Sequence, residues 1–205
     1  MQVFEELDID KRKRIINAGM EEFGIHGYKH ANTEDIARKA GISKGLLFYY
    51  FKNKQSFYLY LFEYCETLLH RYINVEERKQ VDDFYELIRF GAYKKMDLMK
   101  EHPYCMEFVL ELWFSSQENG NDILSERIHK ILSSTYTTWF KDLKLERFKE
   151  GYDPMLIFQM LTWMTQGYLS ERKITRQPLN IDDMMKEFDT WEAMFKKMTY
   201  KEEYV

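Results

Sequence analysis

Between Thr33 and Lys54 the positions of cap and turn residues leave room only for two short helices. Thr33 stands directly before two acidic residues, as an N-cap residue often does, and an apolar Ile-Ala-x-x-Ala pattern follows. Gly41 can adopt a left-handed conformation that other residues adopt only at a cost, so the chain can turn sharply there. Ser43 is the next cap, and its helix ends before the cap at Asn53. The sequence therefore predicts two short helices joined by a tight glycine turn.

The rest of the chain is also predicted to be helical. Only nine Gly and three Pro occur in 205 residues, fewer turn residues than a strand-rich fold usually needs. Apolar residues recur at helical spacing, and there is no internal repeat or low-complexity tract. The predicted helices span residues 11–24, 33–40, 43–51, 53–72, 84–99, 103–116, 123–145, 155–169 and 181–198. We therefore expect an all-α chain of about nine helices.

Charge is unevenly distributed along this acidic chain, whose formal net charge is −4. Residues 26–56 contain six Lys or Arg but only two Asp or Glu. An acidic chain is not suited to coating nucleic acid without specificity, but a small basic face still permits docking on phosphates.

The expected location is the cytoplasm. The sequence contains no apolar run of 18 residues, so we expect no membrane-spanning helix. Cys65 and Cys105 show no Cys-x-x-Cys spacing, and two free thiols are expected in preference to a disulfide.

The run GISKGLLFYYFKNK, residues 41–54, combines lysines with four consecutive aromatic residues. Two short helices joined by a tight turn, within a three-helix unit, are typical of a helix-turn-helix. The second helix begins with Ser43-Lys44-Gly45, and the lack of a side chain at Gly45 would let the backbone approach DNA closely. Tyrosine suits this surface because its ring can pack while its hydroxyl meets a phosphate. The alternative is a small helical core with solvated lysines.

Lys54 is expected to bind a phosphate. A lysine at a helix N-terminus opposes the helix macrodipole. A phosphate bound by both the lysine and the free N–H groups would explain the residue.

The run TEDIARKAGISKGLLFYYFKNKQSF, from Thr33 to Phe57, resembles the DNA-binding domain of the TetR (tetracycline repressor) family of bacterial regulators. Phe23-Gly24 and Gly27-Tyr28 also fit that family, and the resemblance covers about residues 8–68. It implies a helix-turn-helix DNA-binding domain at residues 1–53 and a helical ligand-binding and dimerisation domain at residues 54–205.

The resemblance also implies which residues contact DNA. Those expected at phosphates are Thr33, Tyr49, Tyr50 and Lys54, and those expected at the major groove are Ser43, Lys44, Gly45 and Leu46. Leu46 replaces a residue that is often small and polar, and it could offer only an apolar contact, for instance to a thymine methyl group. Phe48 stands where the family most often has tyrosine; without the hydroxyl, a DNA contact and burial are both open for it.

The second domain is expected to bind a small-molecule effector. The candidate effector residues are Met99, Tyr104, Glu107, Phe108, Glu111, Trp113, Trp139 and Trp163. Glu107 and Glu111 lie four residues apart on one helix face, and two carboxylates among aromatic rings would favour a cationic, aromatic ligand. If that face is solvated, they are only a polar stripe, and ordinary core packing is the alternative for each aromatic residue.

The resemblance also implies a homodimer. Helices at about residues 154–171 and 181–198 of each subunit would form a four-helix interface, and the apolar seam of the last helix agrees with this. The expected interface residues are Phe158, Thr162, Met184, Phe188, Trp191 and Phe195.

Catalysis finds no support in the sequence. There is no His-Glu-x-x-His, no Gly-x-Ser-x-Gly and no glycine-rich phosphate loop, so we expect no enzyme, metal or cofactor. The predicted function is a repressor that leaves a palindromic operator when a small molecule binds. The alternatives are a transcriptional activator, or a protein that binds a small molecule or a partner and has a weakened DNA-binding domain.

Overall fold

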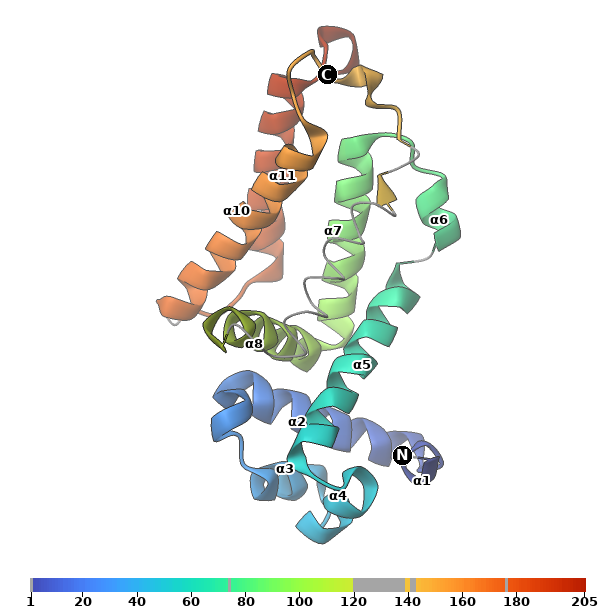
Figure 1. Ribbon diagram of the computed structural model, residues 1–205, viewed down its shortest axis with the longest axis vertical. Helices are drawn as coiled ribbons and strands as arrows, with labels where there is room; N and C mark the ends of the chain where they lie inside the picture. The colour runs from blue at the N-terminus through green and yellow to red at the C-terminus, as the bar shows by residue number, and fades with distance from the viewer. Residues whose placement is uncertain (1, 74, 120–138, 141–142, 176) are drawn as a thin grey trace. The chain divides into compact units, whose positions relative to one another are not determined.

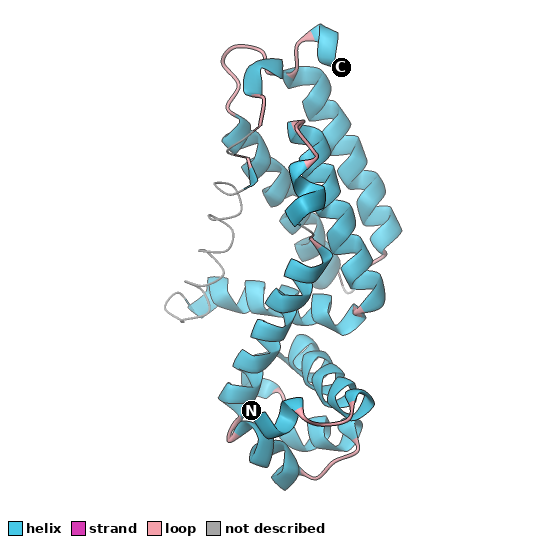
Figure 2. Ribbon diagram, turned by 90° about the vertical axis from the view of Figure 1, so that its right-hand side faces the viewer, coloured by secondary structure: helices cyan, strands magenta, loops and turns pink. Residues whose placement is uncertain are grey.

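The computed structural model describes residues 2–73, 75–119, 139–140, 143–175 and 177–205, and these are mainly helical (Figures 1 and 2). The helices are α1 (Gln2–Glu5), α2 (Ile9–His30), α3 (Thr33–Ala40), α4 (Lys44–Phe51), α5 (Lys54–Tyr72), α6 (Val75–Lys79), α7 (Phe84–Glu101), α8 (Pro103–Asn119), α10 (Pro154–Ile174) and α11 (Ile181–Thr199). Among these residues there is no strand, only an isolated β-bridge between Phe148 and Tyr200. The prediction of an all-α chain is confirmed.

Most predicted helices match observed ones within a few residues. Helices α1 and α6 were not predicted, because four or five residues are too few to show a helical period. The helix predicted at residues 123–145 lies largely outside the described residues. No described helix is both long and apolar enough to cross a membrane.

The chain divides into two compact units. The first contains residues 1–73 and 97–132, and the second contains residues 74–96 and 133–205. The first unit thus includes α5 and α8 in addition to the short helices before them. The functional boundary expected at residues 53 and 54 stays a prediction.

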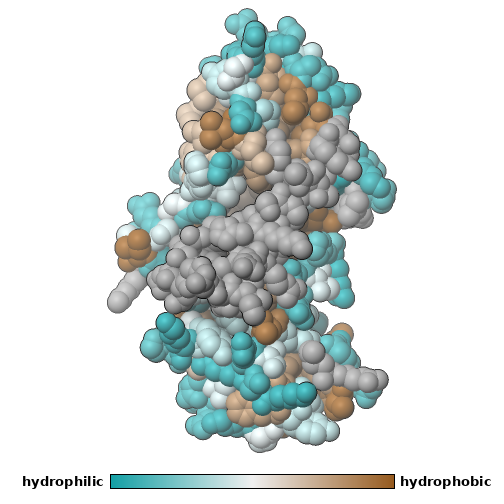
Figure 3. Space-filling view, in the orientation of Figure 1, coloured by the Kyte–Doolittle hydropathy of each residue, from teal (hydrophilic) through white to brown (hydrophobic). Residues whose placement is uncertain are grey.

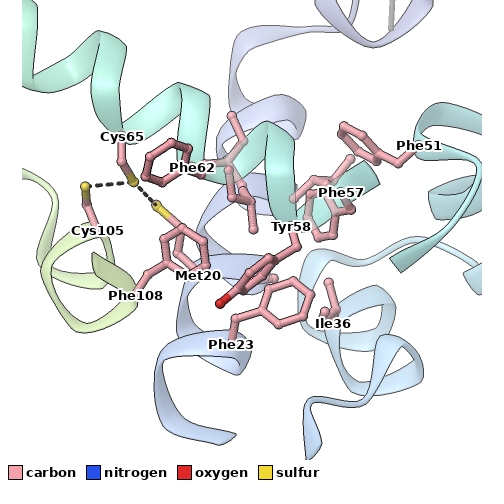
Figure 4. Packing of buried hydrophobic residues seen from close by; sticks show 14 of the residues in the cluster. Met20, Phe23, Ile36, Phe51, Phe57, Tyr58, Phe62, Cys65, Cys105 and Phe108 are labelled. Carbon is pink, nitrogen blue, oxygen red and sulfur yellow. Dashed lines mark hydrogen bonds between the residues drawn. The ribbon is translucent and has the colours of Figure 1, made fainter. Parts of the chain in front are cut away.

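The core of the first unit is built from aromatic rings of α2, α5 and α8 (Figure 4). Helix α8 lies so close to α2 that a Cβ on Gly24 would stand 3.0 Å from the backbone of Glu107 and Phe108. Cys65 and Cys105 are buried free thiols in this core, with their sulfur atoms 3.0 Å apart. The neighbouring Cys105 thiol, together with burial, raises the pKa of Cys65. The predicted free thiols are therefore observed.

The second unit is stabilised around the buried carboxylate of Asp83, which precedes α7. Its Oδ1 accepts hydrogen bonds from the backbone N–H groups of Tyr85 and Glu86, at 2.9 and 3.0 Å. Its Oδ2 accepts from Arg147 at 2.6 Å and from the Tyr200 hydroxyl at 3.0 Å. Burial alone would raise the pKa of Asp83, but these hydrogen bonds and charges hold it below its ordinary value. One carboxylate thus joins the start of α7 to the segments before α10 and after α11.

The surface is mainly hydrophilic on the face that Figure 3 shows, with hydrophobic side chains in separate patches. Large apolar side chains that remain exposed include several on α10 and α11.

We expect Asp83→Asn to lower the free energy of unfolding by about 3 kcal/mol, because it leaves Arg147 facing a neutral partner in a buried site. Urea denaturation at pH 7 measures this change. The wild-type carboxylate contributes stability above about pH 4, which is lost as the pH falls through its lowered pKa. Asp82→Asn is the matched control, since Asp82 lies next in sequence but is exposed, and its effect should be small. Equal effects of the two substitutions would contradict this role of Asp83.

Candidate nucleic-acid interface

The turn between α3 and α4 has the geometry predicted for a helix-turn-helix. Gly41 has φ 69° and ψ 36°, the left-handed conformation that favours glycine. A Cβ on Gly41 would meet nothing within 4 Å, so backbone conformation and not space explains the glycine. Ser43 caps α4 by accepting a hydrogen bond from the Leu46 N–H at 3.1 Å, and Asn53 caps α5 through Ser56 at 2.8 Å. These caps are as predicted.

The N-cap of α3 is Asn32, so the prediction of a cap at Thr33 is wrong. The Asn32 side chain accepts a hydrogen bond from the Glu34 N–H at 2.9 Å, and Thr33 is the first helical residue. The Asn32 N–H in turn donates to the buried carboxylate of Glu22 at 3.2 Å, and Asn32 has extended backbone angles. Both residue types cap helices well, so their adjacency left the cap ambiguous in the sequence.

The start of α4 is open to solvent. Ser43, Lys44 and Gly45 are all exposed, and Tyr49 is the most exposed aromatic side chain described, at 67%. A Cβ on Gly45 would meet only the Ser43 hydroxyl at 3.9 Å, and Gly45 has no positive φ. The fold itself therefore gives no reason for a glycine at this position. A glycine at this position does, however, let the protein backbone approach a bound molecule closely.

The other predicted contacts on α4 are partly or fully covered. Tyr50 is only 6% exposed and belongs to the core, with its ring 5.5 Å from that of Phe4. Leu46 and Phe48 are half-buried, and Leu46 packs against the core. These two departures from the family pattern therefore sit largely within the fold, and α4 still presents Lys44 and Tyr49.

Lys54 has partners within the protein. Its ammonium donates to the carbonyl oxygen of Ala31 at 2.6 Å and to that of Lys29 at 3.4 Å, and lies 5.1 Å from the ring centroid of Tyr28. Burial lowers the pKa of Lys54, although Glu22 acts in the opposite direction. The ammonium thus satisfies carbonyl oxygens at the end of α2 and directly after it. This contact explains a lysine at the start of α5 without requiring a phosphate.

Lys52 was missed by the sequence analysis. It is the one non-glycine residue with positive φ among those described, at φ 64° and ψ −48°, and the Asn53 N–H donates across it to the Phe51 carbonyl at 2.7 Å. Such a γ-turn is strained by about 1–3 kcal/mol. The turn places an exposed cation directly after α4. No sequence signal marks a γ-turn at a lysine.

Three of the six cations of residues 26–56 are paired with acids. Lys44 lies 2.8 Å from Glu34 of α3, with both side chains well exposed, and Arg38 forms an ion pair with Asp35. Lys39 contacts Glu21 at 3.0 Å. The basic face expected from the sequence is therefore partly compensated by acidic residues.

A family model described as "Bacterial regulatory proteins, tetR family" matches residues 15–61, which contain the helix-turn-helix. The helix-turn-helix domain of this chain belongs to the TetR family. The protein is a DNA-binding transcriptional regulator, as the resemblance implied.

Curated relatives of this TetR-family protein are themselves transcriptional regulators. The biofilm operon negative regulator IcaR of Staphylococcus aureus is 22% identical over 163 residues, which cover 78% of this chain and 86% of IcaR. The regulator RutR of Escherichia coli O157:H7 is 26% identical over 168 residues, covering 77% of this chain and 73% of RutR.

Solved structures share the fold across both units. FadR from Bacillus subtilis, in complex with stearoyl-CoA, is 21% identical with a TM-score of 0.61, over 89% of this chain and 96% of FadR. SmeT, the repressor of a Stenotrophomonas maltophilia multidrug efflux pump, is 17% identical with a TM-score of 0.65, over 96% and 95% of the two chains.

Several predicted effector residues have structural roles instead. Phe108 is fully buried in the first unit's core, 5.3 Å from Tyr58, and Tyr104 packs against the same core. Met99 is also buried. Trp139 is half-buried, and a Cβ on Gly91 would lie 3.0 Å from its ring.

The carboxylates of α8 do not support the predicted cationic site. The backbone of Glu107 lies against Gly24, and a Cβ on Gly27 would stand 2.9 Å from Glu111 Oε1, so this face of α8 packs on α2. Glu107 itself is exposed, as the polar-stripe alternative requires. Trp163 is 54% exposed on α10, and the side chain of Trp113 lies outside the described residues.

Half of the predicted dimer residues are buried within the subunit itself, so they have little surface left for an interface. Met184, Phe188 and Phe195 of α11 are 8%, 7% and 4% exposed within a single chain. Phe158 and Thr162 of α10, and Trp191 of α11, are half-buried. A helical period shows that α11 has an apolar seam but does not reveal what covers it. The sequence led us to expect a second subunit over this seam, but side chains of the same subunit cover it.

We expect Glu34→Gln to tighten DNA binding by up to about fivefold at low salt, the equivalent of one exposed ion pair. The wild-type pair must break before Lys44 can contact DNA, and the carboxylate repels phosphates. Fluorescence anisotropy with labelled promoter DNA measures the change, which should shrink as salt is added. In a Lys44→Met background the gain should largely disappear. Weaker binding by Glu34→Gln alone would contradict this account.

Proposed function

We propose that this regulator is a cytoplasmic repressor that binds a palindromic operator as a homodimer and leaves it when a small molecule binds. It acts by binding and not by catalysis. IcaR and SmeT are named as a negative regulator and a repressor, which supports the sign of regulation. FadR with stearoyl-CoA shows that a relative of this fold holds a small molecule, which supports an effector.

The observation that carries the proposal is the surface at the start of α4. Gly45 has no role in the fold, and Lys44 and Tyr49 project beside it. A backbone that can approach DNA, flanked by a cation and a phenol hydroxyl, fits the edge of a major groove. Contacts of Thr33, Ser43 and Lys54 with DNA are part of this proposal.

The dimer interface that we propose is the exposed apolar face of α10 and α11, not the buried seam. Leu156, Met160 and Trp163 lie at helical spacing on α10 and are 47%, 37% and 54% exposed. Met194 and Met198 are 55% and 46% exposed, four residues apart on α11. A groove lined by Met164, Gly167, Tyr168, Glu171, Glu187 and Trp191 continues this face. Contiguous apolar surface of this kind is typical of an interaction site.

Effector binding would act through geometry. Two copies of α4 must reach successive major grooves about 34–36 Å apart. The effector would bind more tightly to a dimer whose α4 helices have a different separation. It then shifts the population away from the DNA-binding state, to an extent set by its difference in affinity for the two states. The placement of Glu107 and Glu111 gives no support to a cationic effector site, because Glu107 is exposed and Glu111 lies against Gly27 of α2.

The first test is binding of the purified protein to its own upstream DNA, measured by fluorescence anisotropy across a salt series. We expect saturable binding that is much tighter than to scrambled DNA. In the same assay, Lys54→Ala should weaken binding to all sequences and reduce the salt slope by about 0.9, because one phosphate contact is lost. An unchanged slope would show that Lys54 serves only the carbonyls of α2. Equal, weak binding of wild type to both DNAs would overturn the proposed function.

We expect Trp163→Glu to convert the dimer into monomers, because it places a charge in the centre of the proposed apolar interface. Sedimentation velocity measures the change in mass. Ile9→Glu is the control, because Ile9 is equally exposed at 56% but lies on α2. A Trp163→Glu protein that still sediments as a dimer would rule out this face.

A further inference from the structure

The segment before α2 contributes a buried aromatic side chain to the support of α4. Phe4 of the short helix α1 is fully buried, although it lies near the end of the chain. Its ring centroid is 5.5 Å from that of Tyr50, 4.6 Å from that of Phe51 and 5.3 Å from that of Tyr60. Two of these partners form the last turn of α4, and the third is on α5. Phe4 therefore packs behind the helix whose opposite side presents the exposed Lys44 and Tyr49.

Polar contacts hold this segment in place. Glu5 Oε2 accepts a hydrogen bond from Arg12 at 2.8 Å, and Arg12 also donates to the Glu5 carbonyl oxygen at 2.9 Å. Glu5 Oε1 accepts from the Tyr60 hydroxyl at 2.8 Å. Burial, and then the hydrogen bond to Glu5, raise the pKa of Tyr60, so its hydroxyl keeps its proton and remains the donor. Helix α1 is thus tied to α2 and α5 while Phe4 contacts α4.

Helix α4 is unusually dependent on such support. It has only eight residues, and an isolated helix of two turns is not stable in water. It ends in the strained γ-turn at Lys52, which the surroundings must stabilise. Without Phe4, the rings of Tyr50 and Phe51 would lose a packing partner on the same side. The orientation of Lys44 and Tyr49 depends on those rings.

We propose that residues 2–7 are part of the DNA-binding machinery, with Phe4 as a positioning residue that fixes the orientation of α4. The inference rests on the proposed function, because it concerns the same DNA contacts. The family match begins only at residue 15, so this support lies outside the part that the chain shares with the family model.

The test compares Phe4→Ala with Met20→Ala in the full-length protein. Both residues are fully buried in the same core, but Met20 lies beside Cys65, with the two sulfur atoms 3.7 Å apart. The readout is selectivity, the ratio of affinities for the protein's own promoter DNA and for scrambled DNA of equal length. At a temperature where circular dichroism shows both variants folded, Phe4→Ala should lose about tenfold or more in selectivity, the value of one good base contact. Met20→Ala should keep the wild-type ratio.

A second pair keeps the test decisive if Phe4→Ala does not fold. Glu5→Gln removes the ion pair with Arg12, whereas Glu6→Gln changes the same charge at the next residue, which is exposed and has no ion pair or hydrogen bond among the described residues. Glu5→Gln should lower selectivity by about two- to threefold, and Glu6→Gln should not. If the two variants of each pair show equal selectivity for promoter DNA over scrambled DNA, the inference is overturned. A wild type with no selectivity would instead overturn the proposed function.

Discussion

The packing of aromatic rings beneath α4 is the interaction on which the rest of this DNA-binding unit depends. A helix of two turns has too few internal hydrogen bonds to persist alone, so side chains beneath it must hold it. Phe51 supplies the centre of that contact, with rings of Phe57 and Phe4 at 4.5 and 4.6 Å. Leu47 completes the buried side of the helix. Because one side is fixed so densely, the opposite side can leave Gly45 and Tyr49 in solvent.

The same close packing connects α2 to α5 and α8. Gly19 allows the ring of Phe57 to approach, and a Cβ there would lie 2.5 Å from it. Gly24 does the same for the backbone of α8. Small residues at these crossings let helices meet at distances that larger side chains would prevent. A shift of α8 against α2 would therefore be transmitted by direct contact to the core that carries α4.

The sequence was most informative where one residue type has one physical reason to be present. Gly41, Ser43 and Asn53 could be placed because a left-handed turn and two N-caps each demand a narrow choice. It was less informative where two adjacent residues serve equally well, as with Asn32 and Thr33. It could not place the partner of Lys54, because the carbonyl of Ala31 lies 23 residues earlier in the chain. Nor could periodicity show whether Phe188 faces its own chain or another.

The pairing of cations in the DNA-binding unit has a consequence for specificity. Lys39 and Lys44 are bound to carboxylates, which compensate their charge, while the ammonium of Lys54 is held in place by carbonyl oxygens. Attraction to phosphates is what gives DNA-binding proteins their sequence-independent affinity. A surface that compensates its own charge, on a chain of net −4, gains little from unspecific DNA. Its affinity must then come from the fit of α4 into a groove, which is why the rigidity of that helix matters more here than the number of lysines around it.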